Sequence, residues 1–570
     1  MFTRNGRSGS CLFPGMVRQW PWSSLLLILA FAACQEAPPP PDPEPDPVEV
    51  IQELNEVFET EEDYSPKRFD PQEIEDHLAN SGVGPADAGQ ILDFYARRDH
   101  QYAWFINDTL SESADAFLAL ISSADTIHKA VASLRDDVGR LIGHGRSHQD
   151  IAKVELDLTA KFFQFASNRY EGFIHNDLKD LAWYIPRKKK NYDRLLDSLV
   201  KGGMDLSAVE PVHPQYFLVK QQLKEIHSLI TLPWDSIRLE GKRKIEPGMK
   251  DPSIARIRQR LHILGDLPIM PDSLPDSLVY DGSLMEAVRS FQQRHGLLMD
   301  GIIGQNVLAA LNVPPDQRLR TLLLNMERLR WLPEQDDANG VMVNIPEFKL
   351  HVYEDAEIRL SMEVVVGKAA TRTVVFSDTI TYLVFSPTWT LPKSIIRNEI
   401  LPALEKDPQY LEKKNMEIIG GTKSDPLIRQ RPGGNNSLGR VKFMFPNSYS
   451  IYLHDTPARS LFQRQERAFS HGCIRVSEPV SLAEYLLRND TTWTTEKIKK
   501  AMHGGKETIV SLKDPVPVMI TYFTAWVDVH GRVNFRDDIY GHDERLAREL
   551  FSAGGELLLG GKADELAVQE

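Results

Sequence analysis

The spacing of hydrophobic residues predicts a long helical region in the N-terminal half of the chain. Between about residues 56 and 245, apolar side chains recur every three or four positions, as at Ala114, Phe117, Leu118 and Ile121. This spacing gives each helix one apolar stripe and favours packed helices over a sheet. No chemical motif stands out in the region, so we interpret residues 56–245 as a helical scaffold domain.

Three shorter apolar stripes follow within residues 246–314 and predict a small three-helix module. The stripes are Ile254, Ile257 and Leu261; Leu284, Ala287, Val288 and Phe291; and Val307, Leu308 and Leu311. Gly296, Gly301 and Gly304 lie between the second and third stripes, where they indicate turns. Residues 315–338 are expected to form a helical linker to the next domain.

After about residue 339 the hydrophobic period shortens to two. Val341, Val343 and Ile345 alternate with other residues, as is typical of strands that bury one face. We therefore predict a mainly β domain over residues 339–512.

An insertion interrupts this β domain. Pro387 and Pro392 break the strand pattern, and a polar, helix-like stretch follows over about residues 393–432. Because strand character returns at residues 441–445, we predict a helical capping insertion between two strands. Residues 513–570 are expected to form a C-terminal hairpin and tail, and the predicted fold class is multidomain α+β.

The N-terminus is typical of an export signal. Arg18 supplies positive charge before the apolar run at residues 25–33, which is too short to span a bilayer as a stable helix. Met16 is an alternative start, since the chain from Met16 onward is a compact signal by itself. We therefore predict a signal peptide over residues 1–33.

Cys34 ends a short run, Phe31-Ala32-Ala33-Cys34, that resembles a lipoprotein signal box. The resemblance implies cleavage before Cys34 and lipidation of its thiol, and an ordinary cleaved signal is the alternative. Residues 34–55, rich in proline and acidic residues, predict an extended tether. The expected location is the periplasm, with a lipid anchor in the outer membrane.

Charge and cysteine content narrow the possible functions. The formal net charge is −14, and no basic face is evident, which argues against nucleic acid as a partner. The three cysteines, Cys11, Cys34 and Cys473, lie far apart and predict neither a disulfide framework nor a cysteine-rich metal site. Cys473 is therefore the only cysteine of the predicted folded domains.

Cys473 lies in the segment Ser470-His471-Gly472-Cys473, which could carry nucleophilic chemistry. A thiol attacks as thiolate and needs a base or a cation nearby. His471 is close in sequence, and His454 offers a second base on a predicted strand, separated from Ser470 by the segment 455–469. The backbone amides of Gly472 and Cys473 could bind an oxyanion.

Two other roles stay open on these residues alone. Cys473 could be a passive core residue, or His454, His471 and Cys473 could bind a metal, since an open catalytic zinc site needs only three protein ligands.

The order of these residues resembles the L,D-transpeptidase family, with its YkuD-type catalytic domain. The family pattern is a histidine, a spacer of narrowly limited length, and then Ser/Thr-His-Gly-Cys, which His454, the segment 455–469 and Ser470-His471-Gly472-Cys473 match. Arg475 stands where many members have asparagine. Further similarity points to the YcbB-like subgroup, at residues 387–389, 433–440, 452–457 and 522–526.

The three-helix module has a resemblance of its own. Residues 291–296 and 300–304 resemble the peptidoglycan-binding module, which implies contact with cell wall glycan. A small helical domain that only packs against its neighbours is the alternative.

The family resemblance implies a role for each site residue. Cys473 is the expected nucleophile and His454 its base, which is oriented by the main chain or the carboxylate of Asp455. Gly472 and Tyr452 are expected at the oxyanion or orienting positions. The residues expected on the substrate side are Arg475, as a clamp for a stem carboxylate, Trp389, Ser470 and His471.

The resemblance also implies a reaction that needs no metal or cofactor. An acyl-enzyme on the tetrapeptide stem of peptidoglycan would be transferred to a neighbouring stem, forming a 3→3 cross-link. Hydrolysis of the acyl-enzyme, or its transfer to another amine, is the near alternative. A non-catalytic, lipid-anchored wall protein and a cysteine protease are alternatives of other classes. The expected partners are stem peptides, glycan and the membrane.

Overall fold

The computed structural model describes residues 66–81, 83–123, 129–187, 190–202, 210, 213–268, 278–333, 339–355 and 357–552. The predicted signal peptide, Cys34 and the tether lie outside the described residues. Within these ranges, no helix has the length and apolar character needed to cross a bilayer.

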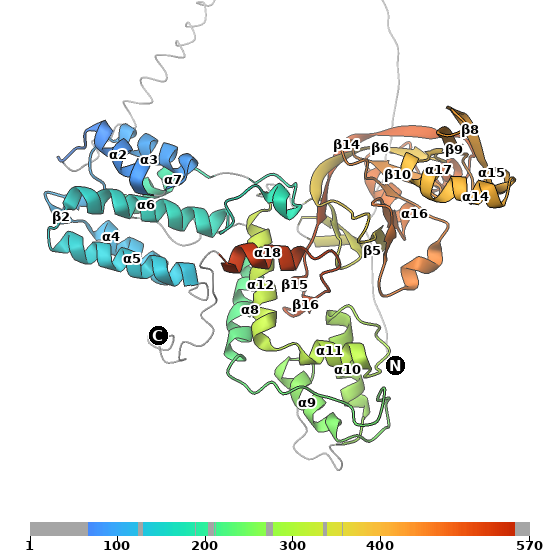
Figure 1. Cartoon of the computed structure of the whole chain (residues 1–570), viewed down its shortest axis with the longest axis horizontal. Helices are drawn as coiled ribbons and strands as arrows, with labels where there is room; N and C mark the ends of the chain where they lie inside the picture. The colour runs from blue at the N-terminus through green and yellow to red at the C-terminus, as the bar shows by residue number, and fades with distance from the viewer. Residues whose placement is uncertain are drawn as a thin grey trace, which may run out of the picture. The chain divides into compact units, whose positions relative to one another are not determined.

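The N-terminal region is helical, as its hydrophobic spacing predicts (Figure 1). Its helices are α2 (Pro71–Ser81), α3 (Pro85–Arg97), α4 (Glu112–Ser123), α5 (Lys129–Arg146), α6 (Ile151–Tyr170) and α7 (Tyr192–Val200). A short hairpin joins α3 to α4 through β1 (Phe105–Ile106) and β2 (Thr109–Leu110). Phe117 and Phe162 are fully buried in the shared core. Glu155 of α6 is also buried, where its carboxylate accepts the backbone N–H groups of Ala103 and Trp104.

The predicted three-helix module consists of α9 (Ser253–Ile263), α10 (Gly282–Arg294) and α11 (Gln305–Asn312) around a separate core. Asp281 caps α10 by accepting the N–H of Leu284 at 2.9 Å. His295, directly after α10, stacks between Phe291 and Phe535 of the C-terminal hairpin.

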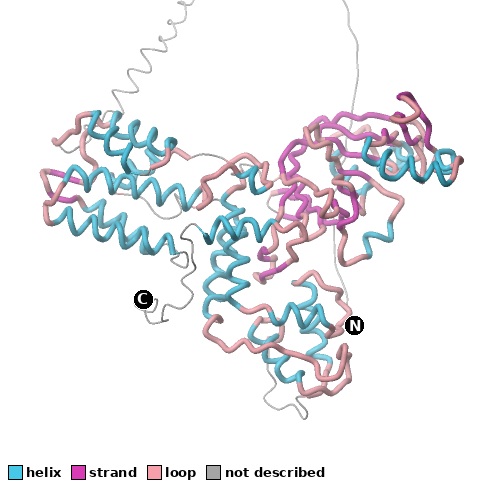
Figure 2. The backbone as a smooth tube through the Cα atoms, in the orientation of Figure 1, coloured by secondary structure: helices cyan, strands magenta, loops and turns pink. Residues whose placement is uncertain are grey.

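The β domain is built on one sheet of nine strands, coloured magenta in Figure 2. The strands are β3 (Gly340–Asn344), β4 (Lys349–Glu354), β5 (Glu357–Gly367), β6 (Phe376–Phe385), β10 (Val441–Met444), β11 (Leu453–His454), β12 (Ala468–Ser470), β13 (Ile474–Val476) and β14 (Thr508–Thr521). Their order is β12-β5-β13-β11-β10-β6-β14-β3-β4, and β5 also pairs with β4. This last pairing closes the sheet into a barrel-like shape. The helices α16 (Pro479–Leu486) and α17 (Thr495–Met502) connect β13 to β14.

Two elements continue across the domain boundaries expected from the sequence. β14 runs through residue 512, and its pairing with β6 shifts register between Ser511 and Val516. The hairpin that follows is short, with β15 (Ala525–Val527) and β16 (Val533–Phe535), and precedes α18 (His542–Ser552). The expected linker contains α12 (Pro315–Arg330), which packs with α8 (Pro214–Ser228) into the core of the β domain.

The insertion between β6 and β10 forms a small subdomain, here called the cap, over residues 389–432. It contains α13 (Lys393–Ile395), a π-helix, η3 (Ile396–Ile400), α14 (Leu401–Lys406) and α15 (Tyr410–Lys413). It also contains a three-stranded sheet of β7 (Trp389–Thr390), β9 (Pro426–Gln430) and β8 (Met416–Gly421), which the sequence analysis did not predict. The cap has a hydrophobic core of its own, separate from that of the barrel, which includes the buried residues Ile395, Ile396 and Ile428.

Candidate active site

Two neighbouring strands bring the predicted nucleophile and base together. β11 and β13 pair in parallel, with Leu453 opposite Ile474 and His454 opposite Arg475. Leu453 and Ile474 are fully buried in the barrel core. Because side chains alternate along a strand, Tyr452, His454, Cys473 and Arg475 share the other face of this strand pair. The N–H of Ile474 donates to the carbonyl of Tyr452 at 3.1 Å, which extends the pairing to Tyr452 and Cys473.

His454 is buried, and one of its ring nitrogens is occupied. Nδ1 lies 2.5 Å from the main-chain oxygen of Asp455. Since a carbonyl oxygen only accepts, Nδ1 carries the hydrogen and Nε2 keeps its lone pair. Burial, followed by the positive charge of Arg475, lowers the pKa of His454 to about 3. The imidazole is therefore neutral at neutral pH.

The carboxylate of Asp455 is turned toward another loop. Its Oδ2 accepts the N–H of Arg440 at 2.9 Å, and Arg459 lies 3.6 Å from Oδ1. A side chain at Gly439 would clash with this carboxylate, and Gly439 has φ +61°. The contact of Asp455 with His454 is thus made by its main chain.

The thiol of Cys473 is partly accessible and lies 3.6 Å from the carbonyl oxygen of Ser450. Burial raises its pKa, while contacts with Tyr452 and the charge of Arg475 act in the opposite direction. Burial and Cys473 in turn raise the pKa of the Tyr452 hydroxyl. At rest the site therefore holds a neutral thiol beside a neutral imidazole.

Ser470 shapes the loop that carries Cys473. Its hydroxyl donates to the carbonyl of Cys473 at 2.5 Å and accepts the N–H of Gly472 at 3.1 Å. The side chain is 2% exposed, so it faces the loop and not solvent. Gly472 has φ +115°, a conformation that side chains disfavour. The N–H of Gly472, which we expected to be available for an oxyanion, is occupied by Ser470.

Arg475 is half-buried and makes no ion pair with a carboxylate anywhere in the described ranges. The nearby acid Glu478 instead accepts a hydrogen bond from Ser481 at 3.5 Å. Burial lowers the pKa of Arg475, and the adjacent Cys473 partly offsets that effect.

His471 and Trp389 connect the site to the cap. Nε2 of His471 lies 2.9 Å from a carboxylate oxygen of Glu399, which belongs to the π-helix η3. Trp389 packs against the cap core. Among the residues that the structure describes, no three His, Cys, Asp or Glu side chains are grouped so as to hold a metal ion.

Sequence reasoning missed two threonines behind the Cys473 loop. The hydroxyl of Thr371 donates to the carbonyl of Ser470 at 3.0 Å, and that of Thr373 donates to the carbonyl of Gly472 at 2.8 Å. Both follow the buried end of β5, where a polar run after an apolar strand was the available signal.

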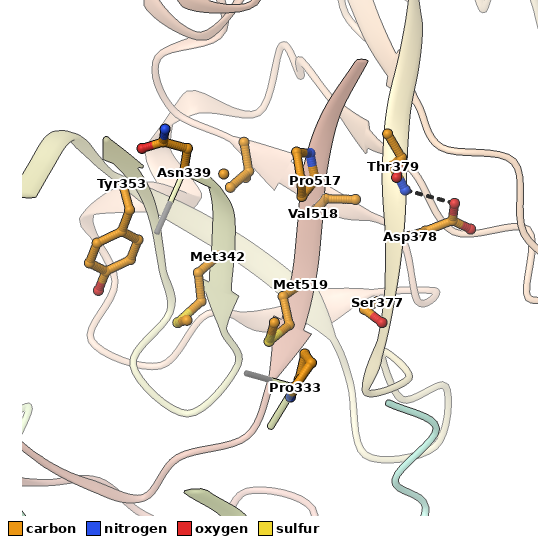
Figure 3. A pocket seen from close by; sticks show the side chains of 12 residues that line it. Pro333, Asn339, Met342, Tyr353, Ser377, Asp378, Thr379, Pro517, Val518 and Met519 are labelled. Atoms are coloured by element: carbon orange, nitrogen blue, oxygen red, sulfur yellow. Dashed lines mark hydrogen bonds between the residues drawn. The ribbon is translucent and has the colours of Figure 1, made fainter. Parts of the chain in front are cut away.

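A pocket of about 300 Å³ lies elsewhere in the β domain (Figure 3). Met342, Asp378 and Met519 help to line it, and they come from β3, β6 and β14. None of its lining residues belongs to the candidate site.

Three family models match successive parts of the chain. A scaffold domain matches residues 89–223, and a "putative peptidoglycan binding domain" matches residues 250–311. The model for the L,D-transpeptidase catalytic domain matches residues 338–518, which contain every predicted site residue from Trp389 to Arg475.

Individual proteins give a similar result over part of the chain. A "putative L,D-transpeptidase" of Haemophilus influenzae is 36% identical over 241 residues, which are 40% of this chain and 48% of that protein. The chain thus spans about half the length of this relative. Among solved structures, an L,D-transpeptidase from Mycobacterium smegmatis is 17% identical, with 33% of this chain and 60% of that chain covered and a TM-score of 0.19. L,D-transpeptidase 3 from Mycobacterium tuberculosis is 16% identical, with coverage of 33% and 63% and a TM-score of 0.18.

The predicted L,D-transpeptidase catalytic domain and the fold class are confirmed, because the motif residues, the barrel-like sheet and the family model coincide on one segment. The chain carries an L,D-transpeptidase catalytic domain, preceded by a scaffold domain and a peptidoglycan-binding domain.

Proposed function

We propose that this protein forms 3→3 cross-links between peptidoglycan stems through an acyl-enzyme on Cys473. The observation that carries the proposal is the parallel pairing of β11 and β13, with His454 and Arg475 opposite one another and Cys473 beside them. The matches to an L,D-transpeptidase catalytic domain and a peptidoglycan-binding domain support the substrate class.

The first step transfers a proton as the carbon–sulfur bond forms. Nε2 of His454 removes the thiol proton while Sγ of Cys473 attacks the carbonyl of the third residue of a tetrapeptide stem. Arg475 favours the thiolate through its charge. The tetrahedral intermediate then expels the amine of the terminal D-Ala, which takes the proton back from His454. The product is a thioester on Cys473.

The second step regenerates the thiol. The side-chain amine of a neighbouring stem attacks the thioester, and His454 accepts its proton. The carbon–sulfur bond breaks as the amide cross-link forms, and His454 returns the proton to the sulfur of Cys473. Water in place of the amine would make the enzyme an L,D-carboxypeptidase or endopeptidase, and another amine would be attached to the stem. Each of these reactions conserves atoms without a metal or a cofactor.

Arg475 is proposed to bind a carboxylate of the donor stem. Arg475 is half-buried and has no carboxylate partner among the residues that the structure describes, and burying such a guanidinium is costly unless an anion binds it. Its planar fork can hold a carboxylate through two hydrogen bonds. This would hold the scissile carbonyl near Cys473, since both residues lie on one face.

Incubation of the purified protein with disaccharide-tetrapeptides, followed by mass spectrometry, tests the reaction. Cross-linked dimers that have lost one D-Ala are expected, together with a transient adduct on Cys473. Cys473→Ala should abolish both and keep the fold. Tripeptide products without dimers would indicate hydrolysis instead. If no adduct forms on Cys473, the result would favour the alternative that the protein is a non-catalytic wall protein.

We also propose that the protein is periplasmic and lipid-anchored through Cys34, which lies outside the described residues. The support is the signal box at residues 31–34. Cys34→Ala should release the protein from the membrane fraction, and an unmodified mature N-terminus by intact mass would contradict the anchor.

A further inference from the structure

A polar strap lies behind the loop that carries Cys473. The strap is formed by residues 368–373, directly after β5. The N–H of Lys368 and the hydroxyl of Thr371 both donate to the carbonyl of Ser470, each at 3.0 Å. The hydroxyl of Thr373 donates to the carbonyl of Gly472, two residues after Ser470, at 2.8 Å.

Thr373 is held so firmly that its hydroxyl can point in only one direction. Its side chain is 1% exposed. The hydroxyl oxygen accepts the N–H of Gly367 at 2.9 Å, which leaves its proton for Gly472. The backbone N–H of Thr373 donates to the hydroxyl of Tyr540 at 3.3 Å, and that hydroxyl donates to the carbonyl of Gly367.

Fixing the carbonyl of Gly472 also fixes the N–H of Cys473. In a trans peptide the C=O and N–H bonds are antiparallel, so the N–H of Cys473 must point away from Thr373. A hydrogen bond to the carbonyl also polarises the peptide and makes that N–H a better donor. In the described part of the chain, the N–H of Cys473 donates to no acceptor, whereas that of Gly472 is used by Ser470.

We propose that Thr373 is a positioning residue, which directs the N–H of Cys473 toward the oxyanion formed when Sγ attacks a carbonyl. It acts through the carbonyl of Gly472 and touches neither the substrate nor the thiol. This inference rests on the proposed acyl-enzyme chemistry. An oxyanion donor is effective only when it is oriented before the reaction, which gives Thr373 its role.

The test compares two reactions of Cys473 in the full chain with Thr373→Val. Acylation by a tetrapeptide stem builds an oxyanion, whereas alkylation by iodoacetamide consumes the same thiolate without forming one. We expect acylation to fall by roughly 10- to 100-fold, which is less than the about 10²- to 10³-fold cost of removing a donor, because the N–H of Cys473 is misaligned but still present. Alkylation should change by less than about threefold. Thr373→Ser keeps the hydroxyl and should restore most of the acylation rate.

Thr371→Val is the matched control, because Thr371 contacts the same loop but not the peptide before Cys473. It should slow acylation clearly less than Thr373→Val. Equal losses of acylation and alkylation in Thr373→Val, or no loss of acylation, would overturn the proposal. If Thr373→Val fails to fold, Thr373→Ala provides the same comparison, because it also removes the hydroxyl that donates to Gly472, and an unchanged acylation rate would again overturn the proposal.

The proposed function would fail differently. In that case the unmodified protein would be alkylated at Cys473 but never acylated by a stem.

Discussion

The two ring nitrogens of His454 have separate surroundings. Nδ1 is held by the main chain of Asp455, which leaves Nε2 as the ring nitrogen with the lone pair. His471 belongs to the loop that carries Cys473, but its ring is paired with Glu399. Proximity in sequence to Cys473 therefore does not identify the base.

Replacing the two histidines should separate their roles. His454→Ala should slow acylation of Cys473 by about 10²- to 10⁴-fold, the usual loss for a general base. His471→Ala should cost clearly less, because it removes a contact to the cap and no proton acceptor. Acylation rates measured from pH 5 to 9 provide the comparison. A larger loss for His471→Ala would mean that the base is wrongly assigned.

The resting thiol should titrate as a single group with a raised pKa. Burial raises the pKa of Cys473 and lowers that of His454, so the thiolate–imidazolium pair is the disfavoured state. Alkylation by iodoacetamide should therefore increase with pH beyond the usual thiol range of about 8.5. A plateau of high reactivity between pH 5 and 7 would indicate a stable ion pair instead.

Arg475 should discriminate between free and amidated stems. Arg475→Lys keeps a charge but loses the planar fork, so it should slow acylation by free-carboxylate stems. Amidating the stem carboxylate should slow the native enzyme substantially and Arg475→Lys much less. Acylation rates of both proteins with both stems form a double-mutant cycle. Additive effects would remove Arg475 from the binding site.

At the level of elements, the cap is weakly joined to the barrel. Its core and its sheet are separate from those of the barrel. The segments 386–390 and 433–440 connect the cap to the barrel. Apart from these segments, one side-chain hydrogen bond or ion pair links the cap to the barrel among the described residues, and it joins Glu399 to His471. Both partners are well exposed, and such pairs contribute about 1 kcal/mol or less.

Glu399→Gln should therefore loosen the cap without unfolding the barrel. Amide hydrogen exchange across residues 391–432 should accelerate by up to about fivefold, the equivalent of one exposed ion pair. The melting temperature should stay nearly unchanged. His471→Ala should give the same acceleration, and combining both changes should add little. Unchanged exchange in Glu399→Gln would show that the pair does not hold the cap.

Sequence patterns predicted several of the elements that bury one face and expose the other. The alternation at Val341 and Val343 predicted β3, and the regular spacing from Ala114 to Ile121 predicted α4. The end of β14 was harder to predict, because Pro515 and Pro517 lie within the strand, near the point where its register shifts.

The same limit applies to the site. The spacing from His454 to Cys473 was readable because both residues belong to one pattern. Thr373 and Glu399 instead lie far along the chain from their partners, Gly472 and His471. Only strand register and folding of the insertion bring these pairs together, and neither follows from local periodicity.

For the whole molecule, buried histidines should make stability depend on pH. Burial lowers the pKa of His213 and His542 to about 4 and that of His454 to about 3, and it also lowers the pKa of His295. These rings stay neutral in the fold but take up protons when unfolded below about pH 6.5. Stability should therefore fall as the pH falls from 6.5 toward 4.

Glu155 opposes this trend, because burial raises its pKa to about 7 and the fold holds its proton. The unfolded chain still binds more protons than the folded chain, because four histidines take up protons on unfolding and one carboxyl releases its proton. The free energy of unfolding, measured by urea titrations at pH 7.5, 6.5, 5.5 and 4.5, should change little above pH 6.5. Below pH 6.5 it should decrease by more than about 1.4 kcal/mol per pH unit, the equivalent of one proton. Constant stability down to pH 4.5 would contradict the buried, neutral state of these rings.

The pairing of β6 with β10 has a consequence for how such a chain can vary. Phe385 lies opposite Val441, and the N–H of Ser386 donates to the carbonyl of Arg440 at 2.8 Å. The two ends of the cap therefore join the barrel at adjacent points, like the ends of a hairpin loop. A tight turn or an unrelated domain could replace the cap without moving β11 or β13. At this position the barrel should tolerate large differences in inserted length, and a reporter protein could be grafted there.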